Sequence, residues 1–203
     1  MGLLQVATNT VTSAVASVTL TGIDTEDCVY MVTVNNFVSV NDGTTLRAKV
    51  TVSGTEQTTS NYQRANKALN ASASFSNDSN TQAAFYLANA IGSAANEQTN
   101  LILYLYNFYK SDEFSFISNE VAGINSSGQL HGRQGGAAYK VAEAHDGLHF
   151  FAGTGNIESG TFNIPIQARN TDFTCAITSD SHLPCHFVSA EIEGFYFRRS
   201  RRM

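Results

Sequence analysis

The chain has 203 residues, a formal net charge of −5 and charged side chains at only 14% of its positions. Because soluble globular proteins usually carry about 25% charged residues, we expect a polar but mostly neutral surface, suited to β-sheets and to lateral contact between subunits. The only basic cluster is the tail 198–203, RRSRRM, which argues against nucleic acid as a partner of the folded domain. The length fits one large all-β domain.

The N-terminal sequence MGLLQVATNTV has neither a positively charged start nor a continuous apolar run. It therefore predicts no signal peptide, and we expect no membrane partner. Three cysteines, Cys28, Cys175 and Cys185, leave one thiol over. Synthesis in the cytoplasm with reduced thiols is the simplest interpretation.

Alternation with a period of two residues predicts antiparallel strands along the chain. In segment 13–20 it places Ala14, Ala16, Val18 and Leu20 on one face. Segment 45–53, TLRAKVTVS, is the clearest strand, with an apolar face made by Leu46, Ala48, Val50 and Val52. Further strands are expected at 29–34, 85–88, 114–117, 137–142, 148–152, 173–177 and 191–197.

Segment 100–109, NLILYLYNFY, is apolar on both faces of the predicted strand. This pattern favours a central strand that has the core on one side and a subunit contact or an apposed loop on the other, although periodicity alone does not distinguish it from a buried helix. Candidate interface residues from this segment are Leu101, Tyr104, Tyr106 and Phe108. An alternative role for the tyrosines, with Tyr109, is a sugar-binding platform.

Segment 161–167, TFNIPIQ, places Phe162, Ile164 and Ile166 on one face and contains Pro165. A proline removes one donor from a strand ladder, so an edge strand or a bulge at Pro165 is expected. Segment 70–82, NASASFSNDSNTQ, is the most loop-like part of the chain. Turns are predicted at 41–43, 53–54, 126–128 and 135–136, and about ten short strands at this spacing indicate a sandwich or barrel.

Possible metal ligands cluster near the C-terminus at Cys175, His182, Cys185 and His186. Their spacing lacks the paired knuckles of structural zinc sites, so ordinary loop and core roles are favoured and no cofactor is predicted.

A second cluster of titratable residues contains His145, Asp146 and His149. The sequence has no GxSxG nucleophile elbow, and a structural role is favoured over a hydrolytic triad. Glu191 and Glu193 are interpreted as a local charge complement to the basic tail rather than as a glycosidase pair. No catalytic residues are assigned, and the protein is predicted not to be an enzyme.

Several segments together resemble a known family. They are 17-SVTLTGI-23, 30-YMVTVNN-36, 46-LRAKVTVSGT-55, 61-NYQRANKAL-69, 101-LILYLYNF-108 and 135-GGAAYKVAEAHDGLHFFAGTGNIESGTFNI-164. In this order they are similar to the jelly-roll virion structural proteins of tailed bacteriophages, especially marine podophages and cyanophages. In that family a Gly-Asn-Ile turn followed by Ser-Gly-Thr-Phe introduces the last core strand. The present sequence departs from the pattern after Ile164.

The resemblance implies an all-β, antiparallel, jelly-roll-like β-sandwich over residues 1–164. The extension, 165–203, lies beyond the resemblance and is expected to pack on the same domain. It implies a tail or tail-fibre-associated oligomeric subunit located in the virion and made in the host cytoplasm. The expected partners are other virion proteins and copies of the same chain, with a trimer favoured. Alternatives are a capsid decoration protein and a carbohydrate-binding module that recognises a host-surface glycan.

The basic tail adds four further interface candidates, Arg198, Arg199, Arg201 and Arg202. As a docking arm, these guanidinium groups would meet acidic or carbonyl-rich surface on a neighbouring virion protein. The simpler interpretation is a solvated terminus.

Overall fold

The computed structural model describes residues 3–26, 29–72 and 75–167, which form strands and no helix. The strands are β1 (Leu3–Val11), β2 (Ser17–Thr21), β3 (Tyr30–Ser39), β4 (Thr44–Val52), β5 (Thr55–Glu56), β6 (Tyr62–Asn70), β7 (Phe75–Gln82), β8 (Phe85–Ile91), β9 (Thr99–Tyr106), β10 (Ser115–Ile124), β11 (Leu130–Tyr139), β12 (Gly147–Ala152) and β13 (Ile157–Gln167). The all-β prediction is confirmed. Within the described ranges no helix could cross a membrane.

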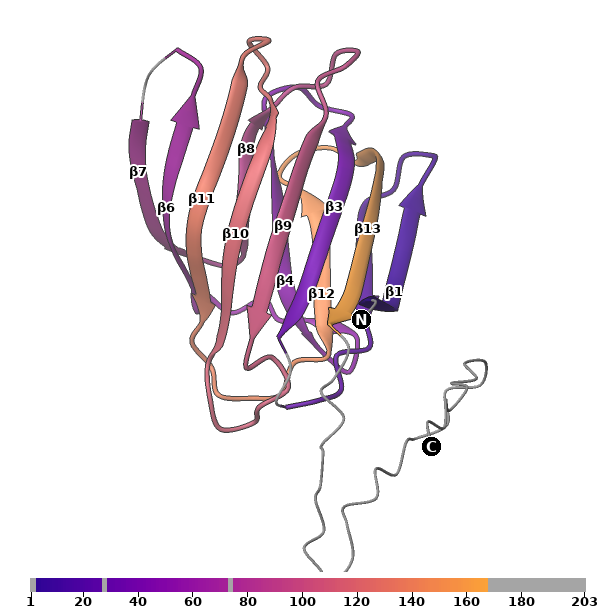
Figure 1. Ribbon diagram of the computed structural model, residues 1–203, viewed down its shortest axis with the longest axis vertical. Helices are drawn as coiled ribbons and strands as arrows, with labels where there is room; N and C mark the ends of the chain where they lie inside the picture. Colours follow the sequence, from indigo (N-terminus) through magenta and orange to yellow (C-terminus); the bar gives the residue numbers. More distant parts are fainter. Residues whose placement is uncertain (1–2, 27–28, 73–74, 168–203) are drawn as a thin grey trace, which may run out of the picture. The chain divides into compact units, whose positions relative to one another are not determined.

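Two antiparallel sheets make a sandwich-like arrangement (Figure 1). The larger has eight strands in the order β1-β13-β3-β9-β10-β11-β6-β7. The smaller has the order β2-β12-β4-β5, with β8 also paired to β4. Figure 1 shows the larger sheet in front, with β4 and β12 behind it. The antiparallel sandwich is therefore as predicted, whereas the jelly-roll topology and the domain boundary at residue 164 stay predictions.

The core lies between the two sheets and follows the alternation of the sequence. On β9, Leu101, Leu103 and Leu105 are buried in it. Leu46, Ala48 and Val50 of β4 are fully buried, which confirms the strand predicted at 45–53. The C-terminal end of β4 departs from the predicted alternation, because Thr51 is buried and Val52 is half-buried. The Thr51 hydroxyl donates to the Asp146 carboxylate at 2.7 Å, so the polar side chain is satisfied inside.

An aromatic cluster closes one end of the core around Tyr62. Its ring packs against Phe85 at 4.7 Å and Tyr139 at 4.6 Å between centroids. The Tyr62 hydroxyl donates to the Gln57 carbonyl at 2.7 Å and accepts from the Val50 N–H at 3.2 Å. Burial raises the pKa of Tyr62 well above its usual range. The hydroxyl therefore stays protonated, and by donating to Gln57 and accepting from Val50 it ties β6 to β4.

The stretch 154–164 is a turn that leads into β13, as predicted. Gly155 has φ +73°, a conformation that favours glycine, and an added Cβ would lie 2.8 Å from the Asn41 side chain, which would have to move. The strand then runs between β1 and β3, which shows that the edge-strand alternative was wrong. The irregularity lies on the neighbouring β1, where the register shifts between Gln5 and Ala7 beside Pro165.

Two predictions of irregular structure were also wrong. Most of segment 70–82 is a strand, β7, which forms a hairpin with β6 at the edge of the larger sheet. Gly135 and Gly136 lie inside β11, where Gly135 faces Asn66 so closely that a Cβ would lie 2.3 Å from its Oδ1. The turns at 41–43, 53–54 and 126–128 are confirmed by positive φ at Gly43, Gly54 and Gly128.

The remaining strand predictions divide into those confirmed and those outside the described residues. Strands occur at or overlap 29–34, 85–88, 114–117, 137–142 and 148–152, and in segment 13–20 the strand begins only at Ser17. Ala14 and Ala16 are exposed rather than on a buried face. The strands predicted at 173–177 and 191–197 lie outside the described residues.

Candidate functional site

The outer face of the larger sheet is the face that points away from the smaller sheet. Its side chains alternate with the buried leucines of β9, and the strand registers place residues of β9, β10, β11, β6 and β7 on it in rows. Seven large apolar side chains on this face are exposed: Leu69, Phe75, Ile102, Tyr104, Tyr106, Phe116 and Leu130. They form two groups, which suggests two separate contact regions.

The first group, Ile102, Tyr104, Tyr106 and Phe116, forms an aromatic ridge over β9 and β10. Tyr106 and Phe116 are directly opposite each other in the β9–β10 pair and are 37% and 44% exposed. The Tyr106 hydroxyl lies 3.3 Å from the Ser118 Oγ. The two rings are thus held side by side at the surface by the cross-strand register.

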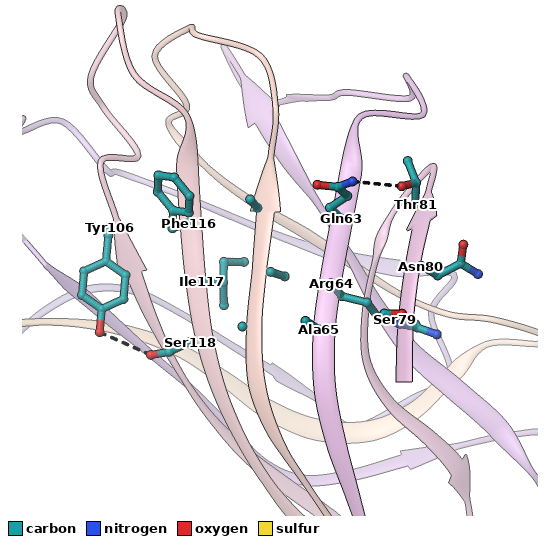
Figure 2. Close-up of a pocket in the computed structure, with 13 residues that line it drawn as sticks. Gln63, Arg64, Ala65, Ser79, Asn80, Thr81, Tyr106, Phe116, Ile117 and Ser118 are labelled. Carbon is teal, nitrogen blue, oxygen red and sulfur yellow. Dashed lines mark hydrogen bonds between the residues drawn. The ribbon is translucent and has the colours of Figure 1, made fainter. Parts of the chain in front are cut away.

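A groove of about 700 Å³ runs beside the ridge. Figure 2 shows the rings of Tyr106 and Phe116 on one side and the side chains of Gln63 and Thr81 on the other. The residues between them are small, with Gly136 and Ala138 of β11 and Ala65 of β6 among those lining the groove. The hollow therefore follows from side-chain size, because large residues flank a strip that has almost none.

The wall opposite the rings carries hydroxyl and amide groups. Gln63 Nε2 donates to Thr81 Oγ1 at 3.3 Å, and Ser79 stands opposite Ala65 in the β6–β7 pair. Arg64 also contributes to the lining, but its guanidinium carbon lies 4.3 Å from the ring centroid of Tyr86, next to the smaller sheet. Residues 63 and 65, which flank Arg64 on β6, and residues 79 and 81, which flank Asn80 on β7, are uncharged.

The second group, Leu69, Phe75 and Leu130, forms a distal apolar patch beside the ends of β6, β7 and β11 (Figure 1). The side chains are 37%, 65% and 58% exposed. They line a smaller hollow of about 330 Å³ together with Gly132. Lys67 Nζ lies 5.6 Å from the Phe75 ring centroid. The patch is the most exposed concentration of large apolar side chains on this face.

The predicted interface residues of segment 100–109 fall into two exposed and two buried side chains. Tyr104 and Tyr106 are exposed on the outer face as predicted, at 40% and 37%. Leu101 and Phe108, in contrast, are core residues at 3% and 1% exposure and are not available to a partner. Phe108 is displaced from the tyrosine face because Asn107 has φ +59°, which ends the strand alternation. Arg198, Arg199, Arg201 and Arg202 lie outside the described residues.

His145 and Asp146 are engaged in contacts that hold the fold together. His145 Nδ1 lies 2.7 Å from Ser115 Oγ, and its Nε2 lies 3.4 Å from the Glu143 carboxylate. Burial lowers the pKa of His145, and Glu143 partly opposes this shift. Asp146 accepts from the Thr51 hydroxyl at 2.7 Å and the Gly54 N–H at 2.8 Å. These carboxylate bonds fix the turn after β4.

His149 lies on β12, away from His145, and is bonded to its neighbours across the smaller sheet. Its Nδ1 lies 2.8 Å from Thr19 Oγ1, and its Nε2 lies 3.6 Å from Glu56. The described part of the chain has no group of three or more His, Cys, Asp or Glu side chains that could hold a metal ion. Cys175, His182, Cys185 and His186 lie outside it.

Sequence reasoning missed Phe116, Phe75, Leu130 and the groove. Phe116 lies in a predicted strand, so its alternation with buried Ile117 was available as a signal. The groove forms because small residues of β11 and β6 lie side by side. The pairing register of the two strands sets this arrangement, and the sequence of one strand alone does not reveal it.

The bacteriophage nozzle protein family model matches residues 127–203. The match covers less than half of the chain, starts in the turn before β11, and extends through β12 and β13 to the last residue. It thus includes 165–203, the part that departs from the resemblance noted in the sequence. No curated protein and no solved structure matches the chain.

The class supported by these findings is an antiparallel all-β virion structural protein of a bacteriophage. Within that class the chain is similar to nozzle proteins over the matched residues. The match supports a place in the phage virion and contact with other virion proteins.

Proposed function

We propose that the protein is a tail-associated structural subunit of a phage virion, which acts without catalysis and assembles with copies of itself. The observation that carries this proposal is the match of residues 127–203 to nozzle proteins. The exposed apolar side chains on the outer face of the larger sheet support the assembly part. A tail-fibre position and a capsid decoration are the competing locations within the same virion.

The distal apolar patch is the proposed subunit contact. Phe75 is 65% exposed and Leu130 is 58% exposed, and contact with a neighbouring subunit would remove this surface from water. The Lys67 ammonium lies near the Phe75 ring, so a neighbouring subunit would have to leave this charge solvated at the edge of the contact. A symmetric oligomer would bury the same patch on every copy.

The assembly proposal is tested with the double variant Phe75→Ser, Leu130→Ser. It should shift the isolated protein toward the monomer in multi-angle light scattering at micromolar concentration, because it removes apolar surface from the contact. The matched control is Val40→Ser, at a valine that is 50% exposed in the turn after β3. The control should keep the oligomeric state of the parent chain. A trimer is the stoichiometry expected from the sequence.

A monodisperse monomer for the parent chain would contradict the assembly proposal. The location is tested separately by labelling purified virions with an antibody against the protein and imaging them by electron microscopy. Label at the tail supports the proposal, and label spread over the capsid shell would favour decoration instead.

A further inference from the structure

We propose that the groove beside the aromatic ridge binds a neutral glycan. This inference deepens and rests on the proposed function, since a glycan site is useful where a virion protein meets a cell surface. The distal apolar patch is a separate surface and is assigned to subunit contacts.

The aromatic wall offers a surface to the apolar side of a sugar ring. Tyr106 and Phe116 are neighbours across the β9–β10 pair, and both rings are more than one third exposed. A sugar ring presents C–H groups on one side, and an exposed aromatic face with a polar tip binds such a partially apolar surface well. The two rings together extend along the groove rather than occupying a single point.

The opposite wall supplies the hydrogen-bonding groups that sugar hydroxyls need. Ser79 and Thr81 present hydroxyl groups, and Gln63 presents an amide, along one side of the groove. Each of these groups can both donate and accept, as a sugar hydroxyl can. A groove with one apolar wall and a few convergent polar groups is the usual composition of a small-molecule site, and about 700 Å³ is within the usual size range.

The charge of the surroundings favours a neutral ligand over an acidic one. The nearest outward-facing charges on these strands are Glu120 and Lys67, which lie in the next row of side chains rather than in the groove lining. Glu120 accepts from Gln134 Nε2 at 3.2 Å, and Lys67 lies near the Phe75 ring. Among the residues that the structure describes, the outward-facing lining of the groove carries no charged side chain, and Glu120 and Lys67 offset each other in the adjacent row, which suits a neutral ligand.

The site is also rigid, because its walls stand on paired strands rather than on loops. The register of β10 with both β9 and β11 is continuous through Phe116 and Ser118. Rigid walls reduce the conformational entropy lost on binding. The described walls of the groove are thus formed before a ligand binds.

The experiment uses the full chain and four neutral hexasaccharides, of glucose, galactose, mannose and N-acetylglucosamine, with polygalacturonate as the acidic comparison. Saturation-transfer NMR detects binding even in an oligomer, and calorimetry gives the affinity. At least one neutral hexasaccharide should bind at millimolar concentration or below. Polygalacturonate should bind more weakly.

Two variants test the site itself. Phe116→Ala removes part of the aromatic wall, and Ala138→Leu fills the floor while leaving both rings in place. Each should weaken binding by about tenfold or more, because Phe116→Ala removes roughly one aromatic contact and Ala138→Leu occupies space that the ligand needs. Tyr104→Ala is the matched control, since Tyr104 is equally exposed on β9 but does not line the groove, and it should change the affinity by less than about twofold.

Absence of binding by all four neutral hexasaccharides would overturn the inference, as would unchanged affinity in both groove variants that melt like the parent chain. Tighter binding of polygalacturonate would also overturn it. Incorporation into virions, measured by quantitative gel analysis, is read separately. Normal incorporation without glycan binding removes the glycan site alone, whereas loss of the tail location would remove the proposed function.

Discussion

Phe162 offers the most direct test of how the two sheets are held together. The side chain is fully buried on β13, which lies between β1 and β3. Its ring contacts Phe37 edge-on at 6.4 Å and Phe150 of the opposite sheet at 5.3 Å between centroids. Replacing it with alanine would therefore leave a cavity that touches both sheets.

The size of the effect follows from the area that is buried. A buried Phe removes about 150–250 Å² from water, which corresponds to roughly 4–6 kcal/mol at about 25 cal/mol per Å². Alanine retains a small part of this, and measured Phe→Ala changes in cores cost about 3–5 kcal/mol. For a chain of this size, Phe162→Ala should lower the melting temperature by about 6–20 °C.

The free energy of unfolding is measured by urea denaturation with far-ultraviolet circular dichroism, at two protein concentrations so that assembly is separated from folding. Phe114→Ala is the aromatic control, because Phe114 is 42% exposed just before β10, and it should cost less than about 0.5 kcal/mol. A loss below about 1 kcal/mol for Phe162→Ala, or equal losses in the two variants, would refute the reasoning.

Three further predictions concern the core and its edges. Tyr62→Phe should cost about 1–3 kcal/mol in urea denaturation, since it leaves a buried carbonyl and N–H without their partner; an unchanged midpoint would contradict this. The free energy of unfolding should be highest above about pH 6.5 and fall as the pH drops below it, because the folded-state pKa of His145 is lowered. His145→Gln should reduce the difference in unfolding free energy between pH 8 and pH 5, and an identical difference would contradict the role of His145. Gly147→Ala should cost about 1–3 kcal/mol or more, because a Cβ would lie 2.0 Å from a backbone oxygen of β2, whereas Gly136→Ala, with 3.4 Å available, should be nearly neutral; equal melting temperatures would contradict the difference.

The sequence predicted best those strands in which one face is buried. In β4 and β9 the alternation of apolar and polar residues matches the burial of Leu46, Ala48 and Val50 and of the β9 leucines. This success has a physical reason, since side chains alternate between core and solvent in a strand of a sandwich. The two apolar faces of β9 also predicted its central position correctly, and Tyr104 and Tyr106 lie exposed on its outer face.

The polar strand β7 was not predictable by the same method. Its sequence, FSNDSNTQ, contains no apolar alternation, because it is an edge strand that contributes little to the core. Its strand conformation comes from continuous pairing with β6 from Tyr62 to Leu69. Backbone hydrogen bonds to a neighbour are independent of side-chain hydrophobicity, so composition predicted a loop instead.

The candidate site was predictable only in part. Tyr106 could be found because its own strand shows the pattern, whereas the groove requires Gly136 and Ala65 to lie in adjacent strands between larger residues. Phe108 was predicted to lie on the surface but is buried in the core, because the positive φ of Asn107 ends the strand alternation before it. Local conformation and cross-strand register therefore determine which side chains lie together on the surface. Alternation with a period of two residues specifies neither of them.

The position of β13 between β1 and β3 has a consequence for how the chain folds during synthesis. The Thr8 hydroxyl donates to Asn163 at 2.6 Å across 155 positions of sequence. Until residues 157–167 leave the ribosome, neither β1 nor the facing edge of β3 has its partner in the larger sheet. Closing such long loops is slow, and exposed strand edges pair readily with other chains. The emergence of β13 thus determines how long β1 and β3 of a nascent subunit are vulnerable to pairing with the wrong neighbour.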